Sequence, residues 1–137
     1  MNKQIRAIST IIMLTLTLGS LSLPLFAKPQ KMVIGRKGTL YLNSSVWAGD
    51  KLLKWGTYQV QHVVEGNDHV IVIKDVPSGA SHRGNTIPGK EVARLMCKLE
   101  PSNKEWKNTM IMLRTNAKGE KEISEIHVAG EKFIHLL

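Results

Sequence analysis

The chain has 137 residues, a formal net charge of +8 at pH 7 and a single cysteine, Cys97. One cysteine excludes an intramolecular disulfide, so the fold must be stabilised by the packing of apolar side chains. The basic residues are spread along the chain and form no long run, which indicates solubility and no nucleic-acid partner. A chain of this length is typical of one domain with a modest core.

Residues 1–27 have the features of a cleaved signal peptide. Basic residues precede an apolar run at 11–18, and Ala27 ends a segment typical of a cleavage site. The run is shorter than the roughly 20 apolar residues of a spanning helix. We therefore expect a signal helix, export to the periplasm or the medium, and a mature domain at 28–137 that does not span the membrane.

The first half of the mature domain reads as short strands joined by tight turns. Residues 57–64 alternate between apolar and polar side chains, which is typical of a half-buried antiparallel strand. Gly66-Asn67 predicts a two-residue hairpin turn, and 69–74 is a β-branched, apolar strand. With this turn, His62 and His69 share one face of the hairpin on a diagonal, with roughly 7–8 Å between their backbones.

The second half breaks this pattern once. Turn-forming residues at 75–90 predict a long loop. Residues 91–99 fit either a strand or a short helix, and the neighbouring strands favour the strand. Further strands are predicted at 107–115, 122–128 and 132–137.

These elements together predict an all-β fold. About seven or eight short strands would follow one another as a single small antiparallel meander, after the signal helix. An open meander leaves unpaired edge strands, so we expect the sheet to close as a barrel or a sandwich.

Three stretches resemble a family of small exported bacterial β-rich proteins. They are Gly-Thr-Leu-Tyr-Leu at 38–42, the strand–turn–strand run Ala-Gly-Asp-Lys-Leu-Leu-Lys-Trp-Gly-Thr-Tyr-Gln-Val at 48–60, and the closing strands at 125–137. Members of that family have a leader peptide followed by a strand-rich domain, so the resemblance implies export and a β-fold. The long loop at 75–90 departs from the family pattern. The shared motifs are turn and strand signatures, and they imply no activity and no site residue.

No constellation typical of an enzyme is evident. Asp75, Ser81 and His82 share the long loop, but turn formation explains all three residue types, and the sequence has no nucleophile elbow. Cys97 lies on the inward face of its predicted strand, where a free cysteine acts as a small apolar residue. We predict a non-enzymatic protein with no catalytic residue and no cofactor.

Aromatic residues near turns are the candidate binding residues. Their side chains combine a flat apolar surface with neighbouring lysines, which suits a glycan, a peptide or a membrane interface, but they could equally plug the ends of a small barrel. The predicted function is an exported binding module for a small apolar or anionic ligand or an envelope component. The alternative is a structural or protein-interaction role in the envelope. The candidate residues are Trp47, Trp55, Tyr58 and Trp106.

A third hypothesis is a periplasmic protein that binds copper or zinc. His62 and His69 would supply two imidazoles from one hairpin face. Met110 and Met112 share one face of their strand, and thioethers are soft ligands that suit Cu(I). Alternate methionines are also common as core filling. The spacing of these four residues matches no established metal motif.

Overall fold

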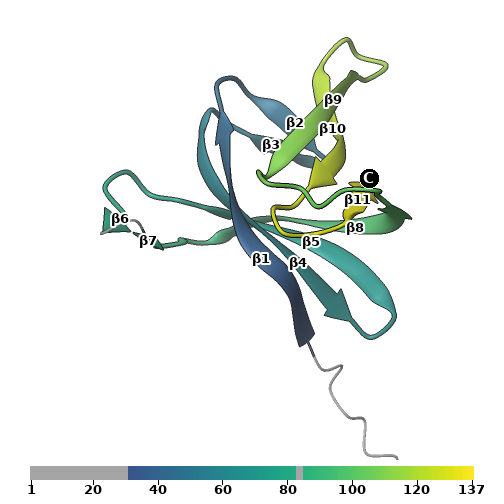
Figure 1. Cartoon of the computed structure of the whole chain (residues 1–137). Coiled ribbons are helices and arrows are strands. Elements are labelled where there is room, and N and C mark those ends of the chain that lie inside the picture. The colour runs from purple at the N-terminus through teal and green to yellow at the C-terminus, as the bar shows by residue number, and fades with distance from the viewer. Residues whose placement is uncertain (1–30, 83–84) are drawn as a thin grey trace, which may run out of the picture.

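The computed structural model describes the backbone of residues 31–82 and 85–137, and this part is all-β, as predicted (Figure 1). The predicted signal peptide at 1–27 lies outside the described residues. Among these residues we find no helix with the length and apolar character needed to cross a membrane. The strands are β1 (Lys31–Leu42), β2 (Val46–Ala48), β3 (Lys51–Leu53), β4 (Gly56–Glu65), β5 (Asp68–Asp75), β6 (Ser81–His82), β7 (Asn85–Thr86), β8 (Glu91–Pro101), β9 (Met110–Thr115), β10 (Lys121–His127) and β11 (Phe133–Leu136).

Nine of the strands form one mixed sheet. Its order is β1-β4-β5-β8-β11-β10-β2-β3, and β9 also pairs with β10. The prediction of a purely antiparallel up-and-down meander is wrong, because β2 pairs in parallel with β10 at Trp47 and Glu122. The β2–β3 hairpin does not pair with β1, the strand before it in the chain. It pairs instead with β10, which comes much later in the chain.

Closure as a barrel or a sandwich is not confirmed. Strands β1 and β3 stand at the two ends of the order, and no pairing joins them within the described residues. The sheet is nevertheless strongly curled. Leu40 of β1, Leu53 of β3 and Ile71 of β5 belong to one buried cluster together with side chains of β10. Both ends of the sheet therefore cover a common core.

The β4–β5 hairpin has the predicted turn and register. Gly66 has a φ of 65°, a left-handed conformation that glycine adopts without strain. The two strands pair Val64 with His69 and His62 with Ile71, as a Gly66-Asn67 turn requires. Local sequence alone thus places the two histidines on the same side of the hairpin.

The predicted long loop at 75–90 contains a short hairpin. Strands β6 and β7 form a separate two-stranded sheet that projects from the side of the molecule (Figure 1). Its neck is closed where Asp75 N donates to Lys90 O (2.9 Å) and Gly89 N donates to Asp75 O (2.7 Å). Residues 91–99 lie in strand β8, which confirms the strand over the helix. Strand β8 pairs with β5 on one side and with β11 on the other, so its backbone N–H and C=O groups have hydrogen-bond partners.

Candidate metal centre

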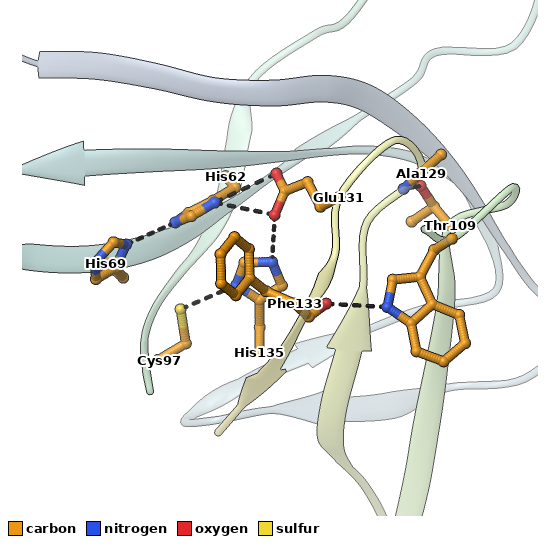
Figure 2. A network of polar contacts seen from close by, with 9 residues as sticks. His62, His69, Cys97, Thr109, Ala129, Glu131, Phe133 and His135 are labelled. Carbon is orange, nitrogen blue, oxygen red and sulfur yellow. Dashed lines mark hydrogen bonds and ion pairs between the residues drawn. The ribbon is translucent and has the colours of Figure 1, made fainter. Parts of the chain in front are cut away.

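One cluster of polar side chains lies at an end of the core, and we call it the Glu131 cluster. Four neighbouring strands and one turn contribute to it. Figure 2 shows that these side chains point toward one another from their separate elements. Its members are His62 (β4), His69 (β5), Cys97 (β8), Glu131 (the turn after β10) and His135 (β11).

The Glu131 carboxylate is the centre of the cluster. His62 Nδ1 lies 3.3 Å from Oε1 and 3.1 Å from Oε2, and His135 Nε2 lies 2.8 Å from Oε2. All three side chains are buried, with exposed fractions of 1% for His62, 4% for Glu131 and 0% for His135. Buried carboxylates must be paired or hydrogen-bonded to be tolerated, and this carboxylate accepts a hydrogen bond from each imidazole.

The backbone of Glu131 is held by the segment that precedes β9. Trp106 N donates to Glu131 O (3.0 Å), and Trp106 O accepts from Gly130 N (2.8 Å). The indole Nε1 of Trp106 also donates to Phe133 O (3.1 Å). These bonds clamp both sides of the turn, so the carboxylate is positioned by backbone contacts as well as by the histidines.

The outer nitrogens of the two central histidines are bonded as well. His62 Nε2 lies 2.9 Å from His69 Nδ1, and His135 Nδ1 lies 3.5 Å from Cys97 Sγ. Because Glu131 accepts N–H from both inner nitrogens, the outer nitrogens are acceptors when the imidazoles are neutral. His69 then donates its Nδ1–H, and Cys97 donates its thiol proton. Both ring nitrogens of each central histidine therefore have a partner.

The cluster changes the acidity of two of its members. Burial alone would raise the pKa of Glu131, but the hydrogen bonds from His135 and then His62 outweigh it and lower the pKa below its usual value. Burial, and secondly the Glu131 charge, raise the pKa of the Cys97 thiol to about 11. The carboxylate is therefore ionised at neutral pH, while the thiol keeps its proton.

The geometry suits a small metal ion. One donor atom from each of His62, Glu131 and His135 can be chosen so that all lie within 4.8 Å of one another. In a tetrahedral site with 2.0–2.1 Å bonds, neighbouring donor atoms are roughly 3.3–3.4 Å apart. The hydrogen-bonded separations of 2.8–3.3 Å are slightly shorter. Separations a few tenths of an ångström longer would match the donor spacing of such a site.

The sequence-predicted metal residues divide into two groups. The hairpin brings His62 and His69 together as expected, but the sequence did not indicate Glu131 and His135 as their partners. Met110 and Met112 lie on β9, exposed to solvent, opposite His127 and Glu125 of β10. Glu131 lies in a predicted turn, where an acidic residue is usually solvated, so the sequence does not indicate it as a metal ligand. The available signal was the spacing of Glu131 and His135, which are four residues apart beside an inward-facing strand.

The candidate binding aromatics do not share one site. Trp55 and Tyr58 line one surface pocket, whereas Trp47 lines another beside the β9–β10 turn. Trp106 stacks on His127 with a centroid distance of 4.0 Å, and Lys104 Nζ lies 4.6 Å from its ring centroid. Trp106 therefore supports the Glu131 turn, and of the four aromatic residues Trp55 and Tyr58 are the two that line the same pocket.

The fold and the cluster define a small all-β domain with a buried centre of two histidines and one carboxylate. Comparison of the chain with protein-family models, with curated proteins and with solved structures found no match. Function must therefore be inferred from the chemistry and geometry of the site itself.

Proposed function

We propose that the protein is an exported, non-enzymatic β-domain that binds one divalent transition-metal ion through His62, Glu131 and His135. What supports this is the convergence of two imidazole nitrogens and a carboxylate oxygen in the buried interior. Protein sites for zinc and related ions commonly use these donor types. The depth of the site favours binding over catalysis, since a buried ion leaves little room for a substrate.

The charge of the cluster also supports a cation. The Glu131 carboxylate is hydrogen-bonded to both imidazoles but keeps its negative charge in the buried interior, so the cluster attracts a cation. A divalent ion would replace the two inner N–H protons and neutralise Glu131. The ion would thereby add a favourable charge interaction to the cluster.

The outer contacts suit the metal-bound form. Metal-ligating histidines usually donate their second N–H to a neighbouring acceptor, which fixes the ring orientation. After binding at Nδ1 of His62 and Nε2 of His135, the outer nitrogens would carry the protons and donate them to His69 Nδ1 and Cys97 Sγ. We therefore assign His69 and Cys97 as positioning residues. The mixed imidazole and carboxylate donors favour Zn²⁺, with Cu²⁺ and Ni²⁺ as competitors.

Export and closure of the sheet belong to the same proposal. The N-terminal pattern and the family resemblance support a periplasmic or secreted protein. The common core under both ends of the sheet supports a sandwich-like shell, with the metal centre at one end of the core. The small apolar or anionic ligand stays a prediction from the sequence, and the buried donor atoms favour the metal ion.

Metal titration of the exported protein tests the proposal. The protein is stripped with chelator and titrated with Zn²⁺ by calorimetry, with native mass spectrometry to count bound ions. We expect one Zn²⁺ per chain and at least 100-fold weaker binding in His62→Ala, Glu131→Ala and His135→Ala. The double variant Met110→Ala/Met112→Ala is the matched control and should bind as the wild type does. Failure of the wild type to bind Zn²⁺, Cu²⁺ or Ni²⁺, or wild-type affinity in all three site variants, would refute it.

A protein-interaction role is a second candidate function. Strand β9 exposes Met110, Met112 and Leu113, and within the described residues its outer edge pairs with no strand. An apolar edge strand is a ready surface for pairing with another chain. Native mass spectrometry of the same sample decides this: a dimer that Leu113→Lys disrupts would support it, and a monomer at micromolar concentration would count against self-association.

A further inference from the structure

A surface pocket of about 510 Å³ lies where the ends of β1 and β4 meet the neck of the β6–β7 hairpin. Pockets of this size are typical of sites for small organic ligands. Three aromatic residues line it: Tyr41, Trp55 and Tyr58. The pocket shares no lining residue with the Glu131 cluster, so a ligand here would bind independently of the metal ion.

Two of the three aromatic side chains of this pocket are exposed to solvent. Tyr41 and Trp55 are each 77% exposed, whereas Tyr58 is buried and donates its hydroxyl to Lys54 O (2.8 Å). Tyr58 thus forms a fixed wall, and the other two rings offer free π-faces. Exposed aromatic faces in a pocket stabilise a ligand through stacking or cation–π contact.

The pocket carries one negative charge. Asp75 lines it and stands opposite Tyr58 in the β4–β5 register. Its Oδ1 is buried and has no hydrogen-bond partner among the described residues. This oxygen lies beside Gly89, which does not line the pocket, so Asp75 acts on the pocket through the charge of its carboxylate. None of the residues that line the pocket, all within the described chain, is basic.

We propose that this pocket binds an organic cation, with an ammonium or guanidinium group between the faces of Tyr41 and Trp55 and the carboxylate of Asp75. Aromatic faces combined with a carboxylate recognise such groups, because both present negative potential to the cation. The local charge is opposite to the net charge of +8 of the chain. This acidic aromatic pocket therefore has charge complementarity to a cation, although the chain as a whole is basic.

Matched charged and neutral probes test the inference. Choline and its uncharged carbon isostere, 3,3-dimethylbutan-1-ol, are titrated into the purified exported protein, with spermidine and arginine methyl ester as further cations. Trp55 is the reporter, through the indole N–H signal in a ¹H–¹⁵N spectrum. We expect at least one cation to shift this signal in a saturable way and the isostere to bind at least tenfold more weakly. Asp75→Asn and Tyr41→Ala should each weaken the cation at least tenfold, and Trp47→Ala should not.

Three outcomes would overturn the proposal. Equal binding of choline and the isostere would indicate a merely apolar pocket. Binding of an N-acetylglucosamine trimer without binding of any cation would indicate a glycan site. No saturable shift with any of the three cations would show that the pocket does not recognise this class. Zinc binding at the Glu131 cluster is unaffected by each of these results, so the two proposals fail separately.

Discussion

His69 and Cys97 are directly opposite each other on strands β5 and β8, and each contacts one of the two histidines that bond Glu131. The five side chains therefore form a continuous series of contacts, and its two end members, His69 and Cys97, are paired residues of neighbouring strands. A change at any member alters the partner of a neighbour in the cluster. This connectivity makes the cluster sensitive to single substitutions.

Glu131→Ala should strongly destabilise the metal-free protein. The substitution removes the acceptor of two buried imidazole N–H groups, and each buried donor left without a partner costs about 1–3 kcal/mol. Urea unfolding at pH 7 in the presence of chelator measures the loss. Glu105→Ala, at an exposed position, is the control and should change stability by less than about 0.5 kcal/mol. A loss below about 1 kcal/mol for Glu131→Ala would contradict the buried-acceptor role.

Cys97 should react slowly with iodoacetamide in the folded, metal-free protein. A rise in the thiol pKa from 9.0 to about 11 lowers the thiolate fraction at pH 8 by about 100-fold. Mass spectrometry follows alkylation in buffer and in urea, where the ordinary pKa returns. The rate in buffer should still be rising between pH 9 and 11. A rate that levels off near pH 9 would mean that restricted access, and not the raised pKa, protects the thiol.

Tyr58 should ionise above its usual pH range. Burial, and then the Asp75 charge, raise its pKa above 10.0, although the hydrogen bond to Lys54 O opposes them. In a Tyr41→Phe background, absorbance at 295 nm reports Tyr58 alone. Asp75→Asn should bring the midpoint closer to 10.0, and an unchanged midpoint would place the carboxylate too far away to act.

The raised pKa of Tyr58 also affects alkaline stability. A group whose pKa is raised by folding contributes its full stability below its unfolded pKa and loses it as the pH rises through the folded pKa. Above about pH 10, the free energy of unfolding of the wild type should therefore fall relative to that of Tyr58→Phe. Below that pH, the difference between the two proteins should stay constant. Chemical denaturation at pH 8 and pH 11 compares the two proteins.

Gly38→Ala should disturb the turn that carries Glu131. A Cβ at Gly38 would collide with Thr109 Oγ1, which accepts a hydrogen bond from Ala129 N (3.1 Å). Displacing Thr109 should cost about 1–3 kcal/mol and weaken Zn²⁺ binding. Thr109→Ala is the matched variant: it loses the bond without the collision, so its thermal unfolding should be affected less. If Gly38→Ala loses no more thermal stability than Thr109→Ala, β1 shifts to accommodate the added methyl group.

Local sequence predicted the parts of the fold that depend on near neighbours. Alternation placed β4 and β5, and the Gly66-Asn67 turn set their register and with it the contact of His62 with His69. The parallel pairing of β2 with β10 could not be predicted in this way. Trp47 and Glu122 are distant in the chain, and nothing in their own segments specifies the partner.

By itself, the sequence determined an all-β chain, the positions of most strands and one half of the candidate site, because turn chemistry and side-chain alternation act over a few residues. Only the tertiary structure decided that Glu131 is a buried acceptor. Pairing of β11 with β8 and β10 folds the turn over the end of the core, where His62, which is 69 residues away in the chain, contacts the carboxylate. A carboxylate is ordinarily solvated in such a turn, and the environment assembled by distant strands gives this one a different role.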